Sequence, residues 1–242
     1  TNTLNDSLAM PDDMVTLSII ASEGLDKPVI EMNGDEQNVE GDIDEWTVER
    51  VFVDGDDDGK ITFSIFFKDY AHNEGEIISK TTDGSVVAFD GTPPELEDIS
   101  LYSNNKFDKS LAVKNDSIFL EFTSTELLRD LNITINENAV GLYDIDNFVY
   151  KYFHVCTSDD TEGLVPIVID YKDMAGNQGE QIIETSDDSN VLFDNTPPEP
   201  FKVQNVGASI KKSKKSSAST KKTTSQASTS INSFFTPTIL IV

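Results

Sequence analysis

The chain has little of the chemistry on which enzymes and disulfide-stabilised domains depend. Its 242 residues include one cysteine and two histidines, so no internal disulfide can form and no nucleophile–base pair can be argued. No apolar run is long enough to cross a bilayer. The first ten residues lack the basic start and apolar stretch of a secretory signal, which indicates an excised fragment or a targeting sequence elsewhere. We therefore expect a protein that is not an enzyme and whose folded part does not insert into membranes.

Basic residues are also scarce, and their distribution is uneven. The chain has 18 basic and 44 acidic residues, for a net charge of −26. Residues 201–242 contain seven of the lysines and no acidic residue. The first 200 residues therefore contain only 11 basic residues but all 44 acidic ones. Such a body repels nucleic acid and anionic membranes, and cations are needed to relieve its self-repulsion.

One proline-containing heptapeptide occurs twice. Phe89–Glu95 (FDGTPPE) returns 104 residues later as Phe193–Glu199 (FDNTPPE), a spacing that matches a small domain. Two adjacent prolines remove two backbone donors and fix two φ angles, so we expect a stiff hinge at each copy. The predicted division is residues 1–94 for repeat one, 95–198 for repeat two, 199–210 for the start of an aborted third repeat, and 211–242 for a tail.

Period-two alternation predicts an all-β fold. Val15–Ile19 aligns with Ile118–Phe122, with apolar residues at every second position, and Trp46 aligns with Tyr150. The strands expected in repeat two lie near Leu96–Ser103, Ser117–Thr123, Leu131–Glu137, Val140, Phe148–Cys156, Leu164–Tyr171 and Glu180–Phe193, the last of them broken around Asp187. Seven strands in about 100 residues match an immunoglobulin-like β-sandwich. We therefore predict two such domains in tandem.

The two repeats differ at their edges. Nothing in repeat one corresponds to Leu96–Ser103, so its first strand is missing, as expected of a chain cut out of a longer array in mid-repeat. The alternative is a strand donated by a neighbouring chain. Phe201–Val206 has the pattern of a first strand for a third repeat. Residues 211–242 are rich in Lys, Ser and Thr, a composition typical of a disordered basic tail.

The sharpest local motif is the acidic loop Asp54–Gly59 (DGDDDG). Carboxylates at alternate positions before a glycine resemble the first half of a calcium-binding EF-hand loop. The loop departs from that pattern at its twelfth position, where Ile65 replaces the bidentate glutamate, and it lies between strands. An acidic hairpin turn without a metal is the alternative interpretation.

Strand order brings further acidic residues to the same place. In a seven-strand sandwich, the chain exit of repeat one should face the chain-entrance loops of repeat two across the hinge. The residues predicted to meet there are Asp54, Asp56, Asp58, Asp90, Glu126, Asp173 and Asn177. So many carboxylates repel one another unless a cation joins them, and oxygen ligands without histidine or thiol favour calcium over zinc. We predict a calcium site at this junction; acidic side chains that simply point to water are the alternative.

A second motif, Asp-x-Ala-x-Asn-x-Gly, has a structural explanation. Gly176 is expected to adopt a positive φ, which His72 at the same place in repeat one can tolerate. The Asp and Asn side chains can close the turn through bonds to the backbone. His154, aligned with Arg50, is expected to be an exposed strand residue.

Three motifs together carry a family resemblance: Ser/Thr-Glu-x-Leu, Asp-x-Ala-Gly-Asn-x-Gly and Phe-Asp-x-Thr-Pro-Pro. Residues 3–206 resemble the tandem immunoglobulin-like repeats of large bacterial surface proteins and adhesins, which are cadherin-like in arrangement. The resemblance implies calcium ligation by Asp90, Asp173 and Asn177, and an extracellular, cell-surface rod whose partners are neighbouring repeats and a surface protein or glycan. A module that binds carbohydrate or a host protein, and a subunit polymerised by donated strands, are the competing functions.

Overall fold

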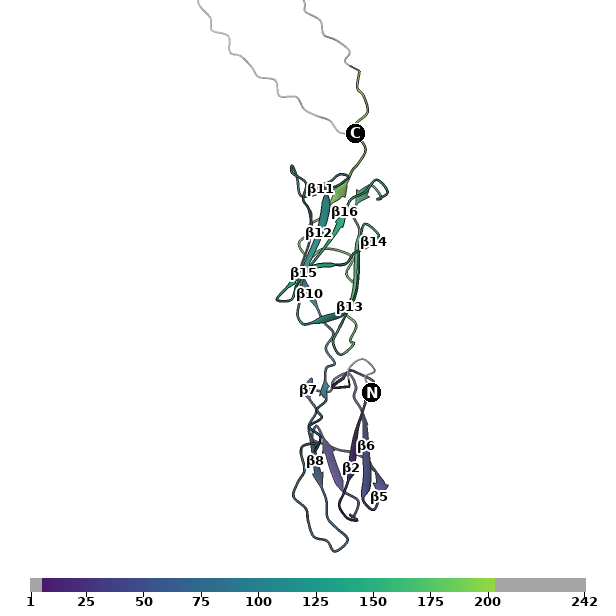
Figure 1. The fold of residues 1–242 in the computed structure, drawn as a ribbon, viewed down its shortest axis with the longest axis vertical. Helices are drawn as coiled ribbons and strands as arrows, with labels where there is room; N and C mark the ends of the chain where they lie inside the picture. Colours follow the sequence, from purple (N-terminus) through teal and green to yellow (C-terminus); the bar gives the residue numbers. More distant parts are fainter. Residues whose placement is uncertain (1–5, 203–242) are drawn as a thin grey trace, which may run out of the picture. The chain divides into compact units, whose positions relative to one another are not determined.

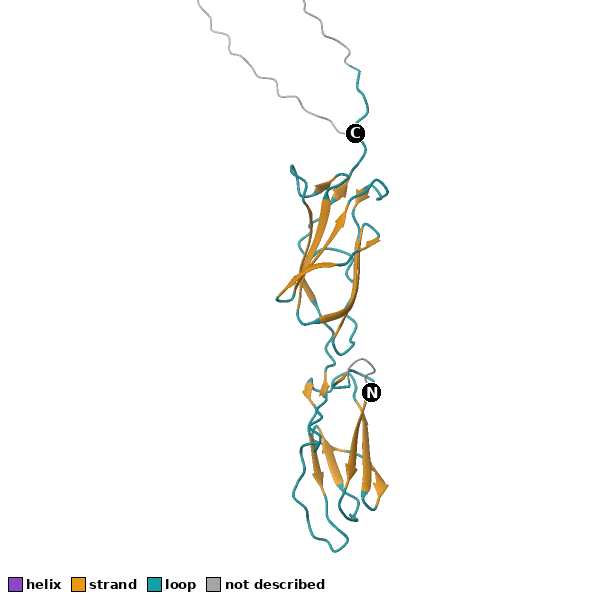
Figure 2. Cartoon of the chain, in the orientation of Figure 1, coloured by secondary structure: helices purple, strands orange, loops and turns teal. Residues whose placement is uncertain are grey.

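The structure is a computed structural model that describes residues 6–202. Residues 6–197 belong to one compact unit. The described chain is made of strands and loops (Figure 2). It contains no helix, and therefore none that could cross a membrane. The prediction of an all-β fold is confirmed, whereas the predicted basic tail lies outside the described residues.

Repeat two is an immunoglobulin-like β-sandwich. One sheet has the order β10-β12-β16-β15, and the facing sheet has the order β14-β13-β18 (Figure 1). The strands are β10 (Leu96–Ser103), β11 (Leu111–Ala112), β12 (Ser117–Ser124), β13 (Leu128–Ile135), β14 (Asn138–Ala139), β15 (Leu142–Asp146), β16 (Val149–Val155), β17 (Gly163–Leu164), β18 (Ile167–Asp173) and β19 (Leu192–Phe193). The first, second, fifth and fourth long strands thus form one layer, as in the immunoglobulin class.

Alternation along β12 shows why this sequence makes a sandwich. Ile118, Leu120 and Phe122 are fully buried, whereas the residues between them are partly exposed. Phe122 stacks on Tyr150 and Tyr152 of β16, with ring centroids 5.4 and 6.0 Å apart. Inward side chains of both sheets therefore form one continuous apolar core, and burial of each large side chain contributes about 1.5–3 kcal/mol.

Repeat one has the same plan with fewer strands. Its sheets have the orders β2-β6-β5 and β4-β3-β8, and a small sheet has the order β1-β9-β7. The strands are β1 (Leu8–Ala9), β2 (Met14–Ile20), β3 (Val29–Met32), β4 (Asp35–Glu36), β5 (Val39–Asp42), β6 (Glu45–Val51), β7 (Gly59–Lys60), β8 (Phe63–Phe66) and β9 (Ala88–Phe89). Among residues 6–94, no strand takes the place of β10.

The last predicted strand of repeat two is interrupted around Asp187 as expected, but the part before the break also lacks regular pairing. Glu180–Phe193 is not a continuous strand: single bridges join Ile182 to Ile169 and Gln178 to Lys172, and regular pairing returns only at β19. The segment between carries the Asp187 turn, in which Ser189 N donates to the Asp187 carboxylate at 2.9 Å. A side-chain-capped turn competes with the ladder here.

Candidate metal centre

The Asp-x-Ala-x-Asn-x-Gly turn builds one side of the site. Asp173 ends β18, is fully buried, and accepts hydrogen bonds from Gly176 N (2.6 Å), Asn177 N (2.9 Å) and Asn177 Nδ2 (2.7 Å). Gly176 has a φ of +114°, and His72 in repeat one has a φ of +65°. The predicted turn is therefore confirmed, with an anionic side chain at its centre.

Three carboxylates from both sides of the hinge converge at this turn. One ligand oxygen each from Asp90, Glu126 and Asp173 lies within 4.8 Å of the other two. Asn177 joins the hinge to the turn directly, because its Nδ2 donates to the Asp90 carbonyl oxygen at 2.8 Å. We call Asp90, Glu126 and Asp173 the joint cluster.

The electrostatics of the joint cluster favour a positive charge. Burial, followed by the negative charges of Asp90, Asp173 and Asp58, raises the pKa of Glu126 from 4.5 to about 7. Burial also raises the pKa of Asp90, and the charges of Asp173 and Asp58 add to that effect. Deprotonating Glu126 beside these carboxylates is therefore unfavourable near neutral pH unless a cation replaces its proton.

Asp58 stabilises the hinge from repeat one. Its carboxylate accepts hydrogen bonds from Gly91 N (2.6 Å) and from the Thr92 hydroxyl, and these bonds lower the pKa of Asp58. The second hinge copy repeats the arrangement, because Glu162 accepts from Asn195 N (2.9 Å) and the Thr196 hydroxyl (2.8 Å). An acidic residue thus clamps each Thr-Pro-Pro segment, a role that the acidic-loop motif did not reveal.

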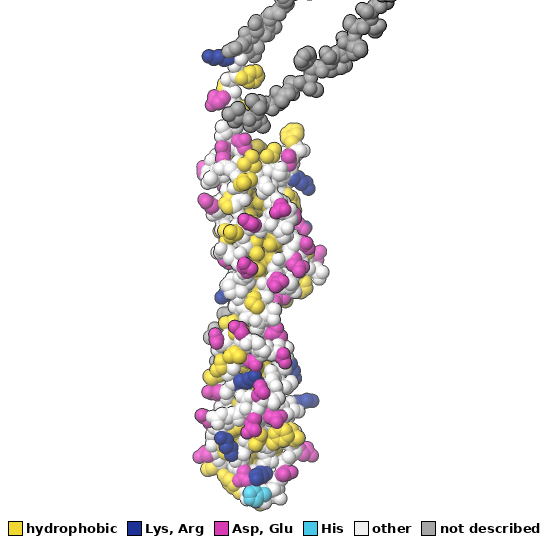
Figure 3. All heavy atoms as spheres, turned by 180° about the vertical axis from the view of Figure 1, so that it is seen from behind, with side chains coloured by type: hydrophobic (Ala, Val, Ile, Leu, Met, Phe, Trp, Pro, Cys, Tyr) yellow, Lys and Arg dark blue, Asp and Glu magenta, His cyan; other side chains and the backbone are white. Residues whose placement is uncertain are grey.

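The remaining residues of the acidic loop are occupied elsewhere or exposed. Asp56 forms an ion pair with Arg50 at 2.7 Å and accepts from Val53 N at 2.9 Å, and Asp54 is exposed. The structure therefore brings Asp90, Glu126 and Asp173 together but does not bring Asp54 or Asp56 to them. Acidic side chains are also spread widely over the surface (Figure 3), so proximity rather than abundance distinguishes the cluster.

His154 corrects one expectation. Its side chain is 13% exposed, and its Nε2 lies 2.9 Å from Asp160 Oδ2. Asp160 also accepts from Thr157 N at 2.6 Å. This pair is the counterpart of Arg50 and Asp56 in repeat one, so the prediction of an exposed strand residue was wrong because the partner carboxylate lies in the following turn.

A row of aromatic side chains crosses the outer face of the β10-β12-β16-β15 sheet. Ring centroids of Tyr102 and Phe119 are 5.5 Å apart, those of Phe119 and Phe153 6.0 Å, and those of Phe153 and Tyr143 5.1 Å. Tyr143 is 61% exposed. Repeat one has Thr16 and Glu49 at the positions of Phe119 and Phe153. This aromatic row depends on the strand register, so alternation alone could not reveal it.

The strand orders β10-β12-β16-β15 and β14-β13-β18 place the chain in the class of immunoglobulin-like β-sandwich proteins. No protein-family model matches the chain, and no curated protein matches it. Among solved structures, the D00-D0 domain of intimin is similar with 9% identity and a TM-score of 0.30, covering 81% of this chain and 98% of that one. A Bacteroides ovatus protein of the mixed-linkage glucan utilization locus, SGBP-B in complex with a mixed-linkage heptasaccharide, is similar with 14% identity and a TM-score of 0.23, covering 81% and 45%.

Proposed function

We propose that the chain is a non-catalytic structural or adhesive segment of an extracellular, cell-surface protein, in which calcium bound at the hinge stiffens a rod-like spacer. The observation that supports this function is the joint cluster, because its carboxylates come from both repeats. Asp90 follows β9 of repeat one, whereas Glu126 and Asp173 belong to repeat two. A cation held by all three would join the two repeats through more than the backbone.

Calcium fits the donor set better than other common metals. Calcium takes six to eight oxygen ligands in flexible geometry, whereas zinc prefers nitrogen and sulfur. Asp90, Glu126 and Asp173 would hold the ion, and the described residues around them offer no histidine or cysteine to that group. The ion would supply the positive charge that three adjacent carboxylates require.

The stiffening can be measured in solution. Small-angle scattering of the whole chain is expected to give a narrower distribution of interatomic distances in calcium than in chelator, and the melting temperature is expected to be higher in calcium. Asp90→Asn should remove both differences. Asp194→Asn, at the same position of the second hinge copy, is the matched control and should retain them. Identical profiles and melting curves with calcium and with chelator would contradict the proposal.

Carbohydrate binding is a second candidate function, favoured by the aromatic row. Sugar rings stack on exposed aromatic faces, and Tyr102, Phe119, Phe153 and Tyr143 form a continuous surface of that kind. Glu121 and Lys151, paired at 3.2 Å, lie on the same strands and supply polar groups beside it.

A glycan array gives a direct test of this second function. Any oligosaccharide that binds the chain is expected to lose at least tenfold in affinity with Tyr143→Ala, because one stacking surface is removed. Tyr70→Ala removes an aromatic residue of similar exposure, 60%, from repeat one and should have no effect. An array without hits, or equal losses in the two variants, would exclude the aromatic row as a sugar site.

A further inference from the structure

The edge strand of repeat one leaves its core partly uncovered. Val15, Leu17 and Ile19 of β2 are each partly exposed, whereas their counterparts Ile118, Leu120 and Phe122 in repeat two are fully buried. Ile20, at the end of the same strand, is 81% exposed. The two strands have the same apolar pattern, so the difference comes from what covers them.

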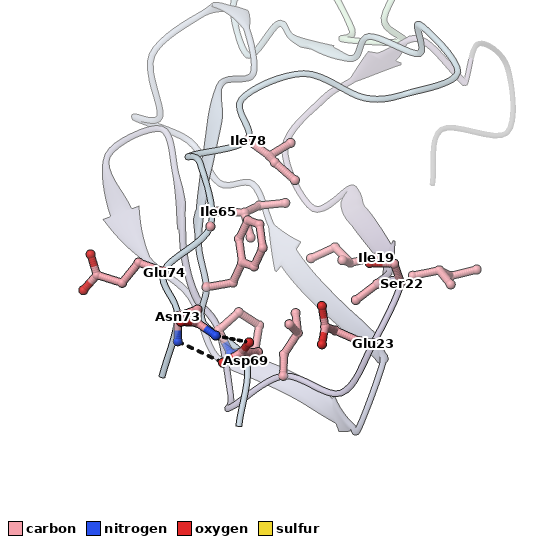
Figure 4. Close-up of a pocket in the computed structure, with 14 residues that line it drawn as sticks. Ile19, Ser22, Glu23, Ile65, Asp69, Asn73, Glu74 and Ile78 are labelled. Carbon is pink, nitrogen blue, oxygen red and sulfur yellow. Dashed lines mark hydrogen bonds between the residues drawn. The ribbon is translucent and has the colours of Figure 1, made fainter. Parts of the chain in front are cut away.

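A cavity lies beside this strand. Its volume is about 350 Å³, and it is lined mainly by apolar side chains. Figure 4 shows Ile19 on one side, facing Ile65 and Ile78 on the other, while Glu74 points away. Ser22 and Glu23 lie at the end of the cavity nearest Asp69. We call this cavity and the outer edge of β2 the strand groove.

Repeat two shows what fills the equivalent space. There β10 pairs antiparallel with β12, with Leu101 opposite Leu120 and Ser100 opposite Glu121. Ile99 and Leu101 are 3% exposed and belong to the same core cluster as Phe122. A first strand therefore buries the apolar residues that remain open in repeat one, so the occupant of the groove is identified within the same chain.

Hydroxyl groups that can accept hydrogen bonds from an added strand are present on the far side of the groove. In repeat two, Ile99 N donates to Ser186 Oγ and Leu101 N to Ser189 Oγ, each at 2.8 Å. Thr82 and Ser85 stand at the serine positions in repeat one and are exposed.

The receiving turn is also the same in both repeats. Thr81 Oγ1 donates to Ser85 O at 2.8 Å, as Thr185 Oγ1 donates to Ser189 O at 2.7 Å. Ser85 is thus held by the same local bond as Ser189, although no strand of residues 6–94 lies beside it.

The mouth of the groove matches in the same way. Glu95 precedes β10 and exchanges backbone and side-chain hydrogen bonds with Thr125, at 3.1 Å from Glu95 N to Thr125 Oγ1. Ser22, which keeps the hydroxyl, takes the place of Thr125 in repeat one. An incoming segment would therefore find at Ser22 the same kind of hydroxyl acceptor that Thr125 offers to the backbone nitrogen of Glu95.

We propose that the strand groove of repeat one binds an added β-strand whose sequence resembles Glu95–Ser103. Such a strand has an acidic residue followed directly by leucine, and further along an isoleucine and a second leucine two positions apart. The strand pairs antiparallel with β2 and places its apolar residues in the cavity, a recognition mode in which backbone bonds provide affinity and side-chain pockets provide specificity. A second copy of this chain, binding through its residues 199–206, is expected to be the weaker occupant. After the second Thr-Pro-Pro-Glu motif, Asn205 stands at the position that Leu101 has after the first motif.

Binding can be tested with a peptide of the sequence of residues 92–103, added to the whole chain in chelator so that calcium plays no part. We expect saturable binding by fluorescence anisotropy, slower hydrogen exchange of the β2 amides, and a higher melting temperature. A peptide with aspartate in place of Ile99 and Leu101 should bind at least tenfold more weakly. Absence of binding at millimolar peptide, or equal binding of the two peptides, would overturn the proposal.

The register supplies a test that does not depend on core substitutions. Ser18 and Thr16 of β2 are exposed and correspond to Glu121 and Phe119, which lie opposite Ser100 and Tyr102. Ser18→Cys should form a disulfide with a Ser100→Cys peptide, and Thr16→Cys with a Tyr102→Cys peptide; the crossed pairs should react at least tenfold more slowly. Equal rates would contradict the antiparallel register. Self-association that disappears when residues 199–206 are deleted would assign the groove to a second copy and overturn the peptide-type occupant.

Discussion

Asp173→Ala is expected to lower the free energy of unfolding of repeat two by about 3 kcal/mol, the largest stability change that we predict for a single polar residue. The carboxylate is fully buried and accepts three hydrogen bonds from Gly176 and Asn177. Truncation leaves these donors without an acceptor in a place that water cannot easily reach. It also releases Asn177, whose amide holds the Asp90 carbonyl.

The matched control is Asp69→Ala in repeat one. Asp69 makes the same bonds to Asn73, at 2.9 Å to the backbone nitrogen and 2.8 Å to Nδ2, but in an exposed turn. Water can replace the lost carboxylate there, so a much smaller loss than that of Asp173→Ala is expected. Urea denaturation separates the repeats, because Trp46 is the only tryptophan and reports on repeat one, while tyrosine signals are mostly from repeat two. Equal losses of unfolding free energy in the two variants would show that burial of the carboxylate does not determine the size of the loss.

Glu126 is expected to make the stability of the metal-free protein fall as the pH rises from about 4.5 to about 7. The pKa of Glu126 in the folded protein is raised to about 7 from 4.5. In this interval the folded state keeps a proton that the unfolded state has released, so each increase in pH favours unfolding. A shift of one pKa unit corresponds to about 1.4 kcal/mol, and discounting for partial exposure leaves an expected loss of about 1–2 kcal/mol.

The corresponding experiment compares wild type with Glu126→Gln in chelator across this pH range. The variant has no proton to lose, so it should become the more stable of the two by about 1–2 kcal/mol at pH 8. Glu23→Gln, the same position in repeat one, should follow the wild-type pH dependence. In excess calcium, the wild-type loss should disappear because the ion binds the deprotonated site. A flat difference between wild type and Glu126→Gln would exclude the raised pKa.

Much of the fold could be predicted because alternation and repetition are local properties of the sequence. Leu96–Ser103 was predicted with its observed bounds, since apolar residues alternate there between two turns. In the segment 180–193 the break around Asp187 was predicted, but the lack of regular pairing before it was not, because the alternation there resembles a strand while side-chain bonds close the neighbouring turn. Period two indicates which residues face the core, and it contains no information about such competition.

The candidate site was only partly predictable, for a related reason. Strand order alone placed Asp90, Glu126 and Asp173 at one junction. Local partners then decided which acidic residues were available for the joint cluster. Asp56 forms an ion pair with Arg50, and Asp58 accepts a hydrogen bond from the hinge. The aromatic row depends on register across four strands, which includes a bulge between Leu142 and Asp144. Such pairings are set by three-dimensional packing and have no signal in a single repeat.

Calorimetric titration of the whole chain with calcium at pH 8 tests the central proposal most directly. We expect saturable binding with a dissociation constant of about 10⁻⁴ to 10⁻³ M, as in extracellular calcium modules. Asp90→Asn is expected to weaken binding at least tenfold, because it removes the ligand that repeat one contributes to the joint cluster. Asp194→Asn, at the same position of the second hinge copy, should leave binding unchanged. Absence of saturable heat with the wild-type chain, or equal weakening by both substitutions, would contradict a calcium site at the hinge.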